Sequence, residues 1–255
     1  LDRLATHMEE SEELKGEIKS AMTYPVVSLV MICCISLGLL VFVLPQFRDI
    51  FDSLKQDMPI LTEAVMNLSD LAQSNFGLIL FSVLGSILGI RMLINTHRGR
   101  RVWDALILRI PIFGPLMQKT IVSRFSGTFA TLIRSGVPIL GALEIVSKTT
   151  GNVHYSEAIE KSADAVRQGE NLGNPLSRTK RFPPMVCRMI AIGERSGSLE
   201  QLLEKVSQFY DSEVRSTVKQ LTSLIEPFLI LIMGGVVGTM VLAMFLPLLQ
   251  MIGNM

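Results

Sequence analysis

The stretch that decides the fold is VVSLVMICCISLGLLVFVL, residues 26–44, which contains no charged side chain. Two further runs of the same length are almost as apolar: residues 76–94 read FGLILFSVLGSILGIRMLI, and residues 228–246 read FLILIMGGVVGTMVLAMFL. A helix rises about 1.5 Å per residue, so each run is long enough to cross the roughly 30 Å hydrocarbon core of a bilayer. Because lipid offers the backbone no hydrogen-bond partners, each run must be helical. The sequence therefore predicts three transmembrane helices.

The composition is that of a membrane protein. Of the 255 residues, 49% are hydrophobic and only 18% are charged, and the mean hydropathy is +0.42, which is too apolar for an ordinary soluble domain. The formal net charge of +1 hides an uneven distribution, because residues 97–223 carry 18 Lys and Arg against 11 Asp and Glu. We do not expect nucleic-acid binding, since this basic block directly follows an apolar run.

The positions of Lys and Arg predict the orientation in the membrane. The second apolar run is followed at once by HRGRR (97–101), whereas the loop between the first two runs carries only Arg48 and Lys55. The positive-inside rule then places residues 97–223 in the cytoplasm. The predicted segments are the end of a first cytoplasmic helical domain (1–24), a transmembrane helix (25–46), an outer loop (47–74), a second transmembrane helix (75–96), a second cytoplasmic helical domain (97–223), a third transmembrane helix (224–250) and an outer tail (251–255).

The second cytoplasmic domain has the punctuation of helices throughout. Proline and glycine predict helices from Pro115 to about Arg134, from Pro138 to about Lys148, over 153–168, and from Pro183-Pro184 to about Glu194, with a short turn at 171–177. A last helix begins at Ser198, an N-cap residue with Gln201 as its capping-box partner, and continues into the third span. We therefore predict an all-α protein whose cytoplasmic part is an antiparallel bundle of about six helices. A short helix at 60–73 is expected in the outer loop.

An internal repeat is also predicted. Pro25 and Pro45 are 20 residues apart, as are Pro227 and Pro247, and each pair brackets an apolar run. Residues 1–45 would then be the last helix and span of a first unit, and residues 97–247 a more complete second unit. The chain starts at Leu1 with a helical pattern already under way and without a visible signal peptide. We expect a piece of a longer protein in which the first unit is truncated.

The sequence offers no catalytic, cofactor-binding or metal-binding residues. It lacks a P-loop motif, a nucleophile elbow and any Cys or His ligand spacing, since Cys33 and Cys34 are adjacent and the three histidines are isolated. Two alternatives to a structural protein remain: a transporter subunit and a membrane-embedded enzyme of unrelated type. A transporter usually needs ionisable groups within its spans, and here only Arg91 lies near a span end.

Three stretches together resemble a known family. They are RFSGTFATLIRSGVPILGALEIVSKTTGN (124–152), FPPMVCRMIAIGERSGSLEQLLEKVSQFYDSEV (182–214) and SLIEPFLILIMGGVVGTMVLAMFLPLLQM (223–251). The chain is similar to the inner-membrane platform proteins of type IV pilus assembly (PilC) and type II secretion (GspF). The amino-acid sequence of the third stretch favours the pilus branch. The resemblance implies a multi-pass protein of the bacterial inner membrane, with its outer side in the periplasm, and with neither enzymatic activity nor a cofactor.

The resemblance also implies partners. These are a hexameric cytoplasmic assembly ATPase, pilin or pseudopilin subunits, other inner-membrane components of the machine, the lipid bilayer and further copies of the chain in a homo-oligomer. A platform of this family couples the ATPase to the insertion of pilins into a growing filament. Which pilin or secreted substrate is involved, and how many copies assemble, are questions that the sequence leaves open.

Five residues are candidates for partner contacts: Arg124, Gly136, Pro138, Glu194 and Glu226. The functional interpretation places the turns around 135–138 and 193–198 on the surface that meets the ATPase, and lets Glu226 contact the positively charged N-terminus of a pilin. The structural alternative gives each a local role. Gly136 and Pro138 would shape a turn, Arg124 would face solvent or an acidic neighbour, and Glu194 would cap the last helix or pair with Arg188 or Arg195.

Overall fold

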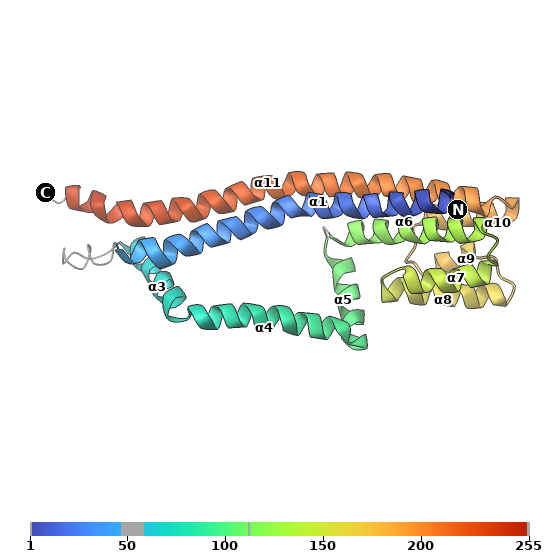
Figure 1. Cartoon of the computed structure of the whole chain (residues 1–255), viewed down its shortest axis with the longest axis horizontal. Coiled ribbons are helices and arrows are strands. Elements are labelled where there is room, and N and C mark those ends of the chain that lie inside the picture. Colours follow the sequence, from blue (N-terminus) through green and yellow to red (C-terminus); the bar gives the residue numbers. More distant parts are fainter. Residues whose placement is uncertain (1, 47–58, 112, 254–255) are drawn as a thin grey trace. The chain divides into compact units, whose positions relative to one another are not determined.

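The computed structural model describes residues 2–46, 59–111 and 113–253, and these contain helices and no β-strand (Figure 1). The chain forms two compact units. The first comprises Leu1–Ser20 and Met92–Leu221, and the second comprises Ala21–Arg91 and Thr222–Met255. Two long helices, α1 (Asp2–Gly38) and α11 (Leu199–Gly253), contribute residues to both units. The predicted all-α class is confirmed over the described residues.

Two or three helices are candidates to cross a membrane. The stretches Gly16–Gln46 and Leu199–Leu246 are long and apolar enough to do so. The helix α4 (Phe76–Asn95) covers the other predicted span. The part of α4 that qualifies as an apolar helix, Phe81–Asn95, is shorter than a membrane span. The third candidate is the pair α5 (His97–Arg109) and α6 (Phe113–Arg134). The bend between these two helices is 109°, so they would have to form one broken span. The count of three at the predicted positions stays a prediction.

The core of the first unit lies among α6, α7 (Ile139–Thr149), α8 (Val153–Arg167), α9 (Gly173–Arg178), α10 (Pro184–Ser196) and the start of α11. Phe125 and Phe129 of α6 are fully buried, and Phe125 also contacts the Phe182 ring, with 4.8 Å between centroids. Other fully buried side chains are Val122, Leu143, Val146, Ile159, Leu172, Leu176, Val186, Ile190, Leu203 and Val206. Each such side chain contributes roughly 1.5–3 kcal/mol relative to an exposed position, so this core is what holds the unit together.

Most predicted helix boundaries in this unit are confirmed, and two expectations are wrong. The segment 171–177 was predicted to be a turn, but it contains the start of the six-residue helix α9, which is held by the burial of Leu172 and Leu176. Ser198 does precede α11 directly, but its hydroxyl bonds to the Ser196 hydroxyl at 2.6 Å rather than forming the capping box with Gln201. The helix α5 was not predicted. Among the described residues of 97–223 there are seven helices, including the short α9.

The second unit has a smaller core, which includes α3 (Ile60–Ser74), the short helix predicted at 60–73. After α1 the chain forms a π-helical turn, η1 (Leu39–Val43). The buried apolar side chains are Leu40, Leu44, Val65, Met66, Met240 and Ala243. Two hydroxyls of α3 tie these helices together, since Thr62 donates to the Ala243 carbonyl at 2.8 Å and Ser69 donates to the Leu40 carbonyl at 2.5 Å.

Candidate partner-binding surfaces

Two of the predicted contact residues form the turn between α6 and α7. Gly136 has φ +79, a left-handed conformation that suits glycine because it lacks a Cβ. The Val137 N–H donates to the Leu132 carbonyl at 3.1 Å, which closes the end of α6 in the manner of a Schellman motif. Pro138 then caps α7, and both Gly136 and Pro138 are exposed. The predicted turn is therefore present, with a surface open to a partner.

This turn lies beside the turn that joins α10 to α11. Arg134, at the end of α6, donates from Nε to Glu200 at 2.5 Å and from Nη2 to Glu204 at 2.6 Å, and both carboxylates belong to the first turns of α11. The hydrogen bond to Glu200 is the main reason that the pKa of Arg134 is raised above its ordinary value. We call residues 135–138 and 196–198 the turn pair. The sequence placed both turns on one surface, but Arg134, which links them, was not singled out.

Glu194 has a different role from the one predicted. Its Oε1 accepts the Leu172 backbone N–H at 3.0 Å, so it caps the start of α9 rather than the last helix. It also forms no ion pair with Arg188 or Arg195. Its Oε2 is buried and has no hydrogen-bond partner among the described residues. The carboxylate therefore stabilises the packing of α9 against α10 and does not extend into solvent.

Arg124 and Glu226 are not part of the turn pair. The Arg124 guanidinium lies beside Gly151, in the loop between α7 and α8. Its Nη1 would be 3.2 Å from a Cβ placed on Gly151. Arg124 forms no ion pair with an acidic side chain among the described residues. Glu226 lies in the second unit, on an exposed face of α11. Within the first unit, the structure thus brings the two turns together, whereas Arg124 lies at the loop between α7 and α8.

A basic pocket that the sequence analysis missed lies between α8, α9 and the loop after α9. It has a volume of about 470 Å³ and is lined by His154, Glu157, Ala158, Lys161, Ala165, Pro175, Arg178, Thr179 and Arg181. Glu157 pairs with Arg101 and Arg178 with Glu170, both at 2.9 Å, whereas Lys161 and Arg181 form no ion pair within the described part of the chain. Uncompensated positive charge therefore remains at the pocket. No group of three His, Cys, Asp or Glu side chains suited to a metal ion occurs in the described segments.

The loop that carries Arg181 has a fixed backbone. The Tyr155 hydroxyl donates to the Arg181 carbonyl at 3.0 Å, and Gln118 Nε2 donates to the same oxygen at 3.3 Å. Lys180 adopts φ 55, which is uncommon for a residue other than glycine and is often associated with a function. Burial raises the pKa of Tyr155 to about 12. The backbone of this loop is therefore fixed where it borders the basic pocket.

The chain is similar to proteins of pilus assembly and secretion. A family model described as type II secretion system protein F matches residues 1–45 and 125–247. "Type IV pilus assembly protein PilC" of Thermus thermophilus is 42% identical over 100% of this chain and 63% of its own length. The PilC of Myxococcus xanthus is 40% identical over 99% of this chain and 61% of its own length. "Type II secretion system protein F" of Pseudomonas aeruginosa is 34% identical over 98% and 62%. The chain thus spans about three fifths of the length of these relatives.

Proposed function

The chain belongs to the type II secretion system protein F family, whose members are structural membrane proteins rather than enzymes, and we propose that it is an inner-membrane assembly platform. In this role it couples a hexameric cytoplasmic ATPase to the insertion of pilin subunits into a filament. Because of this family membership, we prefer the platform function to the two alternatives that the residues alone left open, a transporter subunit and a membrane enzyme. The resemblance inferred from the sequence is confirmed.

The observation that carries this proposal is the similarity along nearly the whole chain to proteins named for pilus assembly and for type II secretion. The pilus branch is favoured, because four proteins named PilC are 34–42% identical to the chain, whereas three named secretion system protein F are 32–34% identical. The two separate matched segments, residues 1–45 and 125–247, also support the predicted two-unit repeat.

The proposed topology has three spans, in α1, α4 and α11. The helix α4 is 20 residues long and therefore rises about 30 Å, enough to cross the hydrocarbon core. In contrast, α6 buries most of one face in the core of the first unit, which argues against a broken span through α5 and α6. Residues 97–223 and the N-terminal segment then face the cytoplasm, and the C-terminus faces the periplasm.

The ATPase contact is assigned to the first unit. The turn pair offers exposed backbone at one end of the unit, and the basic pocket offers Lys161 and Arg181 to an acidic segment of a partner. Complementary charges at such a surface increase the rate of association and suppress incorrect partners. A partner that inserts a carboxylate beside Arg181 would meet a loop whose backbone is already ordered, so little entropy would be lost on binding.

The proposal is tested by measuring the binding of the assembly ATPase to the full chain in nanodiscs. Lys161→Glu and Arg181→Glu, each made alone, should weaken binding, whereas Arg188→Glu, an equal charge change at an exposed position of α10, should leave it unchanged. Binding that is the same for the wild type and all three variants would exclude the pocket as the contact. A chain that never binds the ATPase of its own operon, even with the whole pocket intact, would contradict the platform role.

A further inference from the structure

The helix α5 exposes an apolar stripe to solvent. Val102, Trp103, Leu106 and Ile110 are 69%, 38%, 51% and 37% exposed. Positions 102, 106 and 110 are four residues apart, so their side chains follow one another along a single face, with Trp103 beside them. A cluster of large apolar side chains on an exposed helix face marks a surface that is covered in the working protein.

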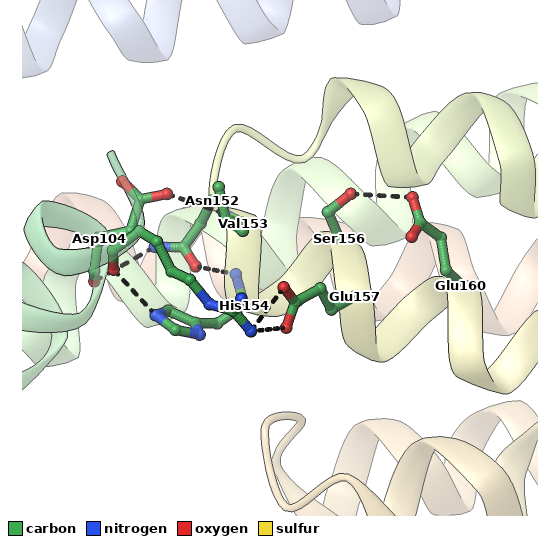
Figure 2. Close-up of polar contacts among 8 residues, drawn as sticks. Asp104, Asn152, Val153, His154, Ser156, Glu157 and Glu160 are labelled. Atoms are coloured by element: carbon green, nitrogen blue, oxygen red, sulfur yellow. Dashed lines mark hydrogen bonds and ion pairs between the residues drawn. The ribbon is translucent and has the colours of Figure 1, made fainter. Parts of the chain in front are cut away.

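The opposite face of α5 is anchored, which fixes the direction of the stripe. Asp104 is buried, and its Oδ2 accepts the Val153 backbone N–H at 2.8 Å at the start of α8. One turn earlier, Arg101 forms an ion pair with Glu157 at 2.9 Å, and its carbonyl oxygen lies 3.2 Å from His154 Nε2. Figure 2 shows Asp104 directed at Val153 at the start of α8, with His154 nearby and Glu157 further along α8. The helix cannot rotate to bury its apolar stripe without breaking these contacts.

Arginines flank the stripe on both sides. At about 100° per residue, Arg98 and Arg109 lie along one border of the stripe and Arg100 lies near the other. All three side chains are exposed, and none forms an ion pair among the described residues. An apolar stripe with a tryptophan, bordered by arginines, is typical of a helix that lies in the interface of a bilayer with anionic lipids.

A tight junction holds the start of α5 against the end of α4. Gly99 lies so close to α4 that a Cβ on it would be 1.8 Å from the Leu93 carbonyl oxygen. Thr96 caps α5, since its hydroxyl accepts the Gly99 N–H at 3.2 Å and donates to the Leu93 carbonyl at 2.6 Å. If α4 crosses the membrane, as the proposed function has it, α5 therefore begins at the membrane surface.

We infer that α5 is an interfacial helix, which lies in the cytoplasmic leaflet with Val102, Trp103, Leu106 and Ile110 at the boundary between headgroups and acyl chains, and with its arginines on anionic headgroups. The helix thereby attaches the first unit to the bilayer through Asp104 and Arg101, separately from the spans. A protein partner is the less suitable occupant, because α5 begins directly at the end of α4 and arginines border its apolar stripe on both sides.

Trp103 is the only tryptophan in the chain, so its fluorescence reports directly on the stripe. The full chain is reconstituted in nanodiscs of phosphatidylcholine and phosphatidylglycerol that contain lipids with a quencher at a shallow or a deep position of the acyl chain. The shallow label should quench Trp103 more than the deep label, and acrylamide in the water should quench it weakly. In a matched control, Trp103→Phe with Ile145→Trp, the new tryptophan lies on the exposed face of α7 and should respond in the opposite way.

Val102→Gln with Leu106→Gln should reduce quenching by the shallow label and increase quenching by acrylamide, with an unchanged melting temperature because both positions are exposed. Trp103 that is open to acrylamide and insensitive to the lipid label would overturn the inference. Trp103 that is shielded from both quenchers would also overturn it and assign the stripe to a second copy of the chain. Maleimide labelling of Glu63→Cys from outside the cell, and of Gln168→Cys only after lysis, shows separately whether α4 crosses the membrane. The two failures are thus distinguishable.

Discussion

The Asp104 carboxylate binds the backbone N–H of Val153 at 2.8 Å, so a residue of α5 caps a helix that begins 49 positions later. The first N–H groups of a helix have no partner within it, and a buried one without a partner is costly. Asp104→Ala should therefore destabilise the protein by about 1–3 kcal/mol, seen as a lower melting temperature in detergent. Asp104→Asn keeps an oxygen that can accept this hydrogen bond, so this variant should lose much less stability. Equal losses in the two variants would mean that the hydrogen bond is not the cause.

Arg134 links the turn pair, so replacing it should separate the two turns. Arg134→Met keeps most of the side-chain volume and removes both ion pairs with Glu200 and Glu204. Partly exposed pairs contribute up to about 1 kcal/mol each, so the loss of stability should be modest. Amide hydrogen exchange should nevertheless become faster at residues 135–138 and 196–198 together. Faster exchange in only one turn would show that Arg134 does not couple them.

Alkaline pH should weaken the first unit through Tyr155. Burial raises the pKa of this phenol from its ordinary value of 10.0 to about 12, so the folded protein favours the protonated form. The corresponding stability is complete below pH 10 and is lost as the pH rises toward 12. Unfolding in detergent should therefore become easier over this range in the wild type and less so in Tyr155→Phe. Tyr210, whose pKa is also raised by burial, is present in both proteins, so only its electrostatic interaction with Tyr155 differs between them.

Glu226→Gln tests the proposed contact with pilin. Glu226 is exposed on α11 next to Pro227, at the predicted entry of the third span. A fixed negative charge there would attract the positively charged N-terminus of an arriving subunit. We expect normal protein levels and fewer filaments, whereas Glu63→Gln on α3 should leave filament number unchanged. Wild-type filament yield in Glu226→Gln would make the carboxylate dispensable, and loss of the protein itself would make its role structural.

Gly234 and Gly238 test self-association. A Cβ on either would meet nothing within 4 Å, so larger side chains fit within one protomer. Small residues four apart let a second helix approach closely in a membrane. Gly234→Leu with Gly238→Leu should therefore reduce crosslinking between copies, while Gly235→Leu, which points about 100° away from Gly234, should have little effect. Crosslinking that is unchanged in the double variant would place the contact on another face.

Helix boundaries in the first unit were predictable because their causes are local. Pro138 and Pro183 precede the helices that they were expected to start, and Gly136 ends α6 where the sequence places the break. The exception is α9, whose Gly173 and Pro175 favour a turn by intrinsic propensity. Burial of Leu172 and Leu176 overrides this preference, and the sequence alone does not indicate which leucines will meet the core.

The candidate surfaces were less predictable, because they depend on contacts between distant residues. Arg134 is 66 positions from Glu200, and the cationic side chains of the basic pocket come from residues 154–181, where nothing in their spacing sets them apart. The pair Glu200 and Glu204, four residues apart on one helix face, was the one available signal that a cation would lie opposite. The role of Glu194 was missed because its partner is a backbone N–H, which sequence does not reveal.

Because of the π-helical turn Leu39–Val43, the packing of the residues that follow depends on the exact number of residues in this segment. A π-turn closes its hydrogen bonds one residue further along than an α-turn does, and here Ser69 supplies an additional donor to the Leu40 carbonyl. Deleting one residue would restore a regular α-helix and rotate all that follows by about 100°. Leu44, only 2% exposed, would then leave the core that it shares with Met240. Homologous chains with this core should therefore tolerate substitutions in the turn but conserve its length.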